Sequence, residues 1–312
     1  MFDDLSTNRM NCDSNHHMHT QTRLGQSWQL GIAVLLTVVG VVAQVGGTQA
    51  QSQVVPDNTL GTEGSVVTPN VEINELTSDR IDGGAIKGSN LFHSFQDFNV
   101  GEGKGVYFTN HQGIENILSR VTGANRSEIL GTLGVLGNAN LFLLNPNGII
   151  FGKNASLDVQ GSFFATTAPI ALGKQGDFSA TKPQQSSLLS VSPGALFFNQ
   201  AASQQGNIIN QGNLSAGKNL TLAGGNLDLQ GQLYAGENLT LQATDTLKIR
   251  DSQASPFLAR SGGNLAIVGN QALDILALVH PTQTSFVSGG NLSLISDGMI
   301  SGDARFSSGG SF

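Results

Sequence analysis

Acidic side chains in the second half of the chain are the first candidates for chemistry. A glycoside hydrolase needs two carboxyl groups held at a fixed separation on either side of the scissile bond. Counted from the nearest Asn-Leu-x-Leu segment, the acids of this region do not share one position, so we interpret them as solvated residues of turns. They are Asp228, Asp245, Asp251, Asp274, Asp297 and Asp303.

Histidine and cysteine predict no metal or catalytic site either. His93, His111 and His280 are scattered, and we expect each at the surface or in a turn. The segment NHHMH (15–19) has the density of a metal site, but it falls, like the sole cysteine Cys12, in a leader that we expect to be removed. No Gly-x-Ser-x-Gly or phosphate-loop motif occurs. We therefore predict no enzymatic activity, no cofactor and no metal.

The leader is predicted from a long uncharged stretch. No charged residue occurs between Arg23 and Asp57, and residues 31–43 (GIAVLLTVVGVVA) are almost wholly apolar. Small residues at Thr48 and Ala50 fit a signal-peptide cleavage after Ala50. The apolar run is shorter than the roughly 20 residues that span a bilayer, so we expect export without stable membrane insertion.

Composition and charge narrow the class of the mature chain. The sequence has 40 Gly and only 12% charged residues, which is typical of a chain rich in turns and poor in helices. The formal charge is −7 and no basic run follows the leader, which argues against nucleic acid and anionic lipid as partners. Met18 is an alternative start to Met1, which would shorten the signal peptide predicted over 1–50.

The second half repeats one pattern. Each copy has a Gly-containing turn, an Asn, and an alternation of Leu with other residues that gives a strand one apolar face. A single copy cannot bury that face, whereas stacked copies can, so the pattern predicts an all-β parallel β-helix rather than a sandwich. The copies are GKNLTL (217–222), GENLTL (236–241), GGNLAI (262–267) and GGNLSL (289–294). The leucines expected to stack inside are Leu220, Leu239, Leu265 and Leu292. The asparagines expected to bond to one another along one corner are Asn219, Asn238, Asn264 and Asn291.

Both ends of this organisation have their own signals. The first half is richer in phenylalanine and less regular, which predicts a boundary near residue 200. Residues 65–74 (SVVTPNVEIN) alternate and are expected to begin a cap over the first coil. Residues 309–312 (GGSF) open another copy without completing it, so we expect this chain to be the front part of a longer protein.

Two segments of the first half allow alternatives. Residues 113–121 (GIENILSRV) fit a helical and an extended pattern, and we favour a strand. The cluster Phe92, Phe95 and Phe98 is expected in the core, with a docking surface for a partner as the alternative.

Three segments of the first half together resemble the N-terminal secretion domain of filamentous-haemagglutinin-like exoproteins of two-partner secretion. The likeness covers about residues 58–185, and the segments NLFHSF and NLFLLNPNGIIFG are most similar to the cyanobacterial members. The three segments are IDGGAIKGSNLFHSFQDFNVGEGKGVYF (81–108), GIENILSRVTGANRSEILGTLGVLGNANLFLLNPNGIIFG (113–152) and SLDVQGSFFATTA (156–168).

This resemblance implies a fold, a partner and a motif. The fold is a right-handed parallel β-helix with an N-terminal cap and small extra sheets, and the partner is an outer-membrane β-barrel transporter that recognises the chain through periplasmic POTRA domains. The family's NPNGI motif is matched by Asn145, Pro146, Asn147, Gly148 and Ile149. Its second motif, NPNL, is replaced by a stretch that keeps only the first Asn, at Asn110. Candidates for contact with the transporter are Phe95, Phe98, Asn99 and Asn110.

The same motif residues predict a tight turn on geometry alone. Pro146 suits the second position of a turn, Asn147 the third and Gly148 the fourth. A structural role and contact with the transporter are compatible at this site.

We therefore predict a secreted or surface exoprotein of the haemagglutinin or adhesin type, exported through the outer membrane and folding vectorially into a β-helix. The expected parts are a signal peptide (1–50), a secretion or haemagglutination-activity domain (51–200) and β-helix repeats (201–312). The adhesive ligand, glycan or protein, is not specified by these residues. One alternative is a secreted carbohydrate-active β-helix enzyme, a lyase or hydrolase; another is a structural surface-layer fragment without a transporter.

Overall fold

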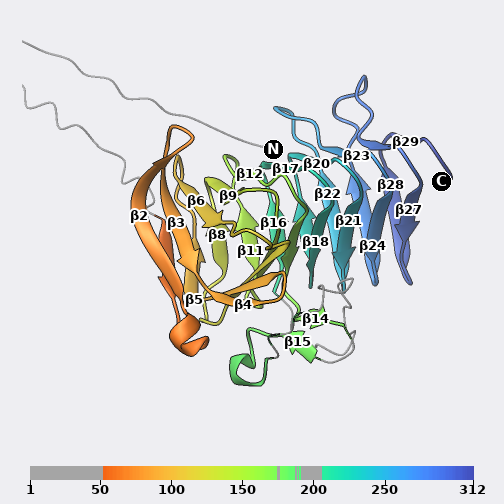
Figure 1. Cartoon of the computed structure of the whole chain (residues 1–312). Coiled ribbons are helices and arrows are strands. Elements are labelled where there is room, and N and C mark those ends of the chain that lie inside the picture. Colours follow the sequence, from red (N-terminus) through yellow and green to blue (C-terminus); the bar gives the residue numbers. More distant parts are fainter. Residues whose placement is uncertain (1–51, 174–175, 187, 189, 191–205) are drawn as a thin grey trace, which may run out of the picture. The chain divides into compact units, whose positions relative to one another are not determined.

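Each turn of the chain passes through three walls of parallel strands, which together form a β-helix (Figure 1). The computed structural model describes residues 52–173, 176–186, 188, 190 and 206–312, so the predicted leader and its cleavage site at Ala50 lie outside the described residues. From β7 onward, strands of the three walls pair in parallel with their counterparts in the preceding coil. The all-β parallel β-helix is confirmed, and its right-handed sense stays a prediction.

Sheet A is the longest wall. Its strands follow the order β1-β5-β7-β10-β13-β18-β21-β24-β27, and β4 pairs with β5 beside this path. They are β1 (Gln53–Pro56), β4 (Ala85–Lys87), β5 (Asn90–Asn99), β7 (Asn116–Val121), β10 (Asn140–Leu144), β13 (Phe163–Thr166), β18 (Leu220–Gly224), β21 (Leu239–Ala243), β24 (Leu265–Gly269) and β27 (Leu292–Ile295).

Sheet C is the second wall, reached after a corner. Its strands are β8 (Ser127–Ile129), β11 (Ile149–Phe151), β16 (Ile208–Asn210), β19 (Leu227–Leu229), β22 (Thr246–Arg250), β25 (Ala272–Leu276) and β28 (Met299–Asp303).

Sheets B and D form the third wall, and a bridge between Val159 and Ala216 joins them. Sheet B contains β2 (Ser65–Ile73), β3 (Leu76–Gly83), β6 (Gly105–Thr109), β9 (Thr132–Leu136) and β12 (Ser156–Asp158). Sheet D contains β17 (Asn213–Ala216), β20 (Gln232–Ala235), β23 (Leu258–Ser261), β26 (Phe286–Ser288) and β29 (Phe306–Ser308). A coil therefore reads A, C and then B or D, as in β7-β8-β9 and β27-β28-β29.

Inward-facing leucines stack along the coil axis as predicted. Leu220 pairs in register with Leu239, Leu239 with Leu265, and Leu265 with Leu292. All four are buried, and each fully buried leucine contributes about 2 kcal/mol relative to an exposed one. Because the inward side chains of each coil pack on those of the next coil, the three walls share one continuous core.

A ladder of polar side chains runs along the corner that precedes sheet A. Each member accepts, on its side-chain oxygen, a hydrogen bond from the next coil at 2.9 to 3.3 Å. The predicted bonding of the repeat asparagines is confirmed, and the ladder also continues through the first half of the chain, which was not predicted. The members of this corner ladder are Asn90, Asn116, Asn140, Ser162, Asn219, Asn238, Asn264 and Asn291.

The N-terminal cap is made by antiparallel pairing. Strand β1 pairs antiparallel with β5, and β2 pairs antiparallel with β3, so each lies at the edge of its sheet and covers the first coil. The segment 65–74 thus belongs to the cap as predicted, but the cap begins earlier, at β1. The ambiguous segment 113–121 contains strand β7, also as predicted.

A second apolar cluster covers the outer face of sheet A in the first coils. The antiparallel hairpin of β14 (Ile170–Leu172) and β15 (Gly176–Phe178) lies there, together with β4. The short helices η1 (Gly61–Glu63) and η2 (Pro183–Gln185) flank these elements in sequence. The cluster contains Ala85, Phe92, Leu118, Phe142, Leu144, Ile170, Leu172, Phe178 and Ala180. Strands such as β7 are therefore buried on both faces, unlike the alternating β21.

The three phenylalanines of β5 divide between these two cores. Phe92 belongs to the outer cluster, whereas Phe95 and Phe98 both face the inside of the coil. Phe95 and Phe98 share a face because a bulge interrupts the pairing of β1 with β5 between them. The expectation that the cluster is core is confirmed.

Candidate functional site

The Asn-Pro-Asn-Gly segment forms the corner between β10 and β11. The N–H of Gly148 donates to the carbonyl of Asn145 at 3.1 Å, which closes the predicted tight turn. Gly148 has φ of +113°, a conformation that favours glycine. Ile149, which ends the motif, is fully buried in the coil core.

Asn145 holds this corner against the preceding coil. It is fully buried, and its Nδ2 donates to the carbonyl of Asn125 and to Oγ of Ser127, both at 3.0 Å. Its Oδ1 accepts the backbone N–H of Asn147 at 2.9 Å. One side chain therefore satisfies groups of two successive coils, which is a structural task.

The glycine of the motif is required by the next coil. A Cβ on Gly148 would lie 2.8 Å from the carbonyl oxygen of Asn207. The N–H of Gly206 donates to the carbonyl of Pro146 at 2.9 Å, which holds the two backbones together. Gly148 is thus explained by packing against the following coil, whereas Pro146 contributes to that contact only its backbone carbonyl.

Asn147 is the member of the motif that is exposed. Its Nδ2 donates to the carbonyl of Gly123 at 2.8 Å and to Oδ1 of Asn145 at 3.2 Å, but its side chain faces solvent. The two preceding coils carry polar groups near this corner: Asn99 accepts the N–H of Glu128 at 2.8 Å, and Arg126 pairs with Glu128 at 2.8 Å. Asn99 therefore lies beside β8, two coils before Asn147 and level with Ile150 rather than with Asn147 itself.

The remaining candidates lie elsewhere. Asn110 follows β6 at the other end of the coil path, where its side chain packs against Gly137. Phe95 and Phe98 are 0% and 1% exposed, and their rings pack at 5.2 Å. A partner could touch these two rings only before the chain has folded.

The six acids that could have formed a glycosidase pair were predicted to lie in turns, and this prediction is only partly confirmed. Asp245, Asp251 and Asp297 do lie in turns, but Asp228 and Asp274 lie in strands β19 and β25. The six acids do not share one register, as predicted, but Asp228 and Asp274 are both in register with Lys248, which stands between them. A shorter corner before β19 hid this alignment, and Asp303, in β28, is also a strand residue.

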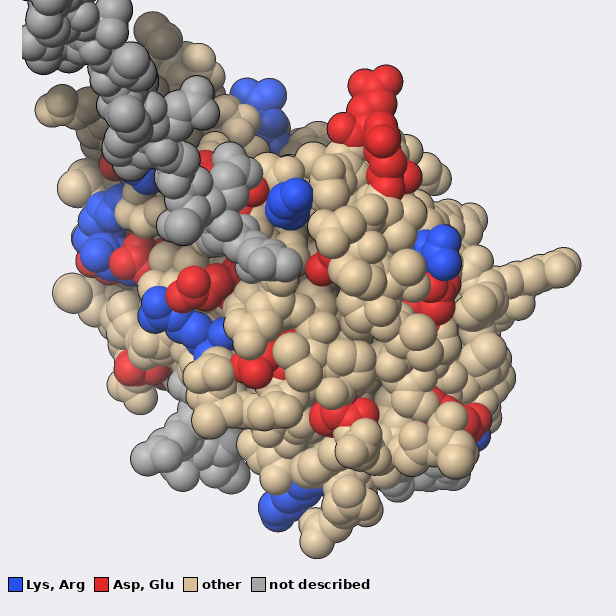
Figure 2. Space-filling model, turned by 90° about the vertical axis from the view of Figure 1, so that its left-hand side faces the viewer, with Lys and Arg blue, Asp and Glu red and all other residues tan. Residues whose placement is uncertain are grey.

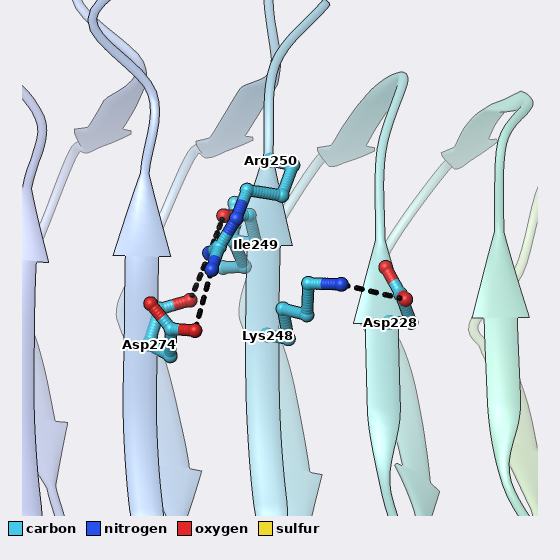
Figure 3. Close-up of polar contacts among 5 residues, drawn as sticks. All are labelled: Asp228, Lys248, Ile249, Arg250 and Asp274. Carbon is cyan, nitrogen blue, oxygen red and sulfur yellow. Dashed lines mark hydrogen bonds and ion pairs between the residues drawn. The ribbon is translucent and has the colours of Figure 1, made fainter.

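Cations accompany both strand carboxylates (Figure 3). Lys248 Nζ lies 3.4 Å from Asp228, and Arg250 binds Asp274 at 2.5 Å and its carbonyl at 2.8 Å. A glycosidase needs two carboxyl groups free to act on the same bond, whereas each of these carboxylates is paired with a cation of the neighbouring strand β22. This arrangement is a charge ladder on the outer face of sheet C rather than an acid–base pair.

His93 contradicts its predicted place at the surface. It is fully buried, facing the coil interior beside Phe108, with Nδ1 3.0 Å from Oγ of Ser65. Its pKa is lowered to about 3, first by burial and second by the nearby His111, while Asp82 acts in the opposite direction. The prediction failed because His93 shares the inward parity of Leu91 and Phe95. His111 and His280 do lie in turns, as predicted.

The described residues contain neither a candidate metal site nor a membrane-spanning helix. No group of three or more His, Cys, Asp or Glu in the described part of the chain could hold a metal ion. Within the same residues, no helix has the length and apolarity needed to cross a bilayer. Charges on the cap side are mixed, and Figure 2 shows basic and acidic residues interspersed among uncharged ones.

Arg120 was missed by the sequence analysis. Of the residues that the structure describes, it has the largest fully buried side chain, and it bonds Ser94, Thr59 and Ser179. The available signal was a single arginine inside the apolar run NILSRV.

Fold and corner together define a β-helical secretion domain with a capped N-terminal end. A family model described as "TPS secretion domain" matches residues 52–311. The chain therefore belongs to the TPS secretion domain family of two-partner secretion exoproteins, which are secreted across the outer membrane.

Two relatives come from Haemophilus influenzae. The heme/hemopexin-binding protein is 25% identical over 148 residues, which is 47% of this chain but only 15% of that protein. The crystal structure of the HMW1 secretion domain aligns with a TM-score of 0.43 and 18% identity, over 81% of this chain and 66% of that one.

Proposed function

We propose that residues 52–312 are the part of an exoprotein that its transporter recognises and that folds first. The transporter is an outer-membrane protein with POTRA domains and a β-barrel. The observation that carries this proposal is membership of the TPS family over 52–311. The expected leader would bring the chain to the periplasm, with cleavage after Ala50. The mature protein is then secreted or displayed at the cell surface.

The coil architecture suits export of an unfolded chain. From β7 to β29 the strands of the three walls pair with the same position of the coil before them, and only hairpin β14–β15 stands outside this pattern, so the coils can fold in the order in which they emerge. Each added coil buries apolar surface and hinders backward movement, which gives direction without a nucleotide. The chain after the leader has no cysteine, so no disulfide closes a loop before threading.

The exposed corner is the proposed recognition element. Asn147 presents its side chain to solvent, and Asn99 lies two coils earlier, beside β8. Phe95 and Phe98 would contact the transporter only while the chain is extended, because folding buries them. Asn110 would act separately.

Finer assignments rest on the sequence patterns. We assign residues 51–200 to the secretion domain and 201–312 to β-helix repeats, although hydrogen-bonded sheets cross this division, since β13 pairs with β18. An adhesin or haemagglutinin role, without enzymatic activity, follows from the resemblance, and the paired carboxylates do not favour the carbohydrate-active alternative. The affinity with cyanobacterial members rests on the wording of NLFHSF and NLFLLNPNGIIFG.

Binding and export test the proposal together. We expect the purified chain to bind the POTRA domains of its transporter, and Asn147→Ala to reduce export severalfold while the circular dichroism spectrum and urea midpoint stay close to wild type. Asn226→Ala is the matched control, because Asn226 is a corner asparagine between the same two walls of a later coil. Absence of POTRA binding by the wild-type chain would refute the proposal, and equal export of both variants would remove Asn147 from it.

A further inference from the structure

Arg120 lies on the outer face of sheet A, under the second apolar cluster. Its guanidinium donates three hydrogen bonds. Nε donates to Oγ of Ser94 at 2.9 Å, one terminal nitrogen donates to Oγ1 of Thr59 at 2.9 Å, and the other donates to the carbonyl of Ser179 at 2.8 Å. Its Cζ lies 4.7 Å above the ring of Phe178. A buried cation is tolerated only when such partners are all present, because an unpaired charge is costly to desolvate.

The cap joins the same network through Asp57. Ser94 and Thr59, which accept from Arg120, donate their own hydroxyl protons to Asp57 at 2.8 and 2.6 Å. Thr122 donates to the same carboxylate at 2.5 Å. Burial raises the pKa of Asp57, but these hydrogen bonds outweigh it and hold the pKa below its ordinary value.

Partners of Arg120 come from both directions along the chain. Thr59 precedes it by 61 residues and Ser94 by 26, whereas Ser179 follows it by 59. The cap partners therefore emerge before Arg120 and the hairpin partners last. Until the hairpin arrives, one arm and one face of the guanidinium lack their protein partners, and the apolar outer face of β7 and β10 is uncovered.

We propose that Arg120 couples the cap to hairpin β14–β15, so that residues 52–180 close as one cooperative unit and only later coils add one at a time. This inference deepens the vectorial folding proposed above. It changes the first step of that process, because the early coils would not lock until the chain through Ser179 is available. Delayed locking keeps the recognition segments extended while the transporter binds them.

Amide hydrogen exchange of the purified protein across a urea series tests the coupling, because it shows which segments open together. In wild type, amides of β1 and of β14–β15 should share one opening with the same urea dependence. Thr59→Val removes the bond from Arg120 together with the bonds of the same hydroxyl to Asp57 and Ser94, yet it should lower protection in β14–β15 about tenfold. Thr62→Val is the matched control, since Thr62 is exposed in η1, and it should leave the hairpin unchanged.

A second variant guards against misfolding and locates the coupling. Arg120→Lys keeps the charge but loses the planar fork, and it should lower protection in β1 and β14–β15 together. The proposal is overturned if Thr59→Val changes β1 alone, or if the wild-type hairpin opens at lower urea than the cap. No transporter is present in this experiment, so a failure of export leaves its outcome unaffected.

Discussion

Oδ1 of Asn145 accepts the backbone N–H of Asn147 at 2.9 Å, so the buried asparagine of the motif sets the backbone of the exposed one. The two residues are identical in type and two positions apart, yet they have different surroundings. Asn145 bonds the preceding coil from a fully buried position, whereas Asn147 lies at the surface. Stability and recognition can therefore be separated within one short turn.

We expect Asn145→Ala to destabilise the folded domain by about 2 kcal/mol, because truncation leaves the buried hydroxyl of Ser127 and the carbonyl of Asn125 without their donor. Urea denaturation followed by circular dichroism measures the loss as a lower midpoint with an unchanged slope.

The control for this variant is Asn147→Ala, which loses two hydrogen bonds of an exposed side chain that water can replace, and it should cost less than about 1 kcal/mol. A cost for Asn147→Ala equal to that of Asn145→Ala would contradict the separation of roles.

The corner ladder predicts that the same Asn→Ala substitution destabilises the protein more in an early coil than in a late one. Asn116 is buried and both donates to Asn90 and accepts from Asn140, so Asn116→Ala should cost about 1 to 3 kcal/mol. At Asn264, water can replace the lost acceptor, and Asn264→Ala should cost no more than about 1 kcal/mol. Urea midpoints of the two variants provide the comparison.

Serine offers a matched control for the ladder, since Ser162 already occupies one rung and its Oγ accepts a backbone N–H at 3.3 Å. Asn264→Ser should therefore lose less stability than Asn264→Ala. Equal losses at Asn116 and Asn264 would mean that burial does not set the strength of this ladder.

Local pattern was sufficient to predict one core. In the repeats, Leu alternates with polar residues and the fold places every second side chain inside, so the stack of Leu220, Leu239, Leu265 and Leu292 followed directly. The same Asn-then-apolar wording at Asn90, Asn116 and Asn140 could have predicted the rest of the ladder, but their strands lack the alternation that drew attention to the repeats.

The outer core could not be predicted in this way. Whether the second face of β7 is buried depends on hairpin β14–β15, which lies far along the chain, and no periodicity within β7 carries that information. Arg120 and its partner Ser179 are joined by the same long-range packing. The corner of Asn145 to Gly148 is the opposite case, since its turn chemistry is local and was predicted residue by residue.

The buried histidine predicts a loss of stability on mild acidification. The folded-state pKa of His93 is about 3, below its ordinary value of 6.5, mainly through burial. Between these values the unfolded chain binds a proton that the folded chain does not, so the stability present above pH 6.5 falls as the pH is lowered, by up to about 1.4 kcal/mol per pH unit. Urea denaturation at pH 7.5, 6, 5.5 and 5 measures this slope. In His93→Phe the slope over that range should be smaller by most of that amount, even if the variant is less stable throughout, while the partly exposed His280→Gln should keep it. An unchanged slope in His93→Phe would show that other groups control the acid response.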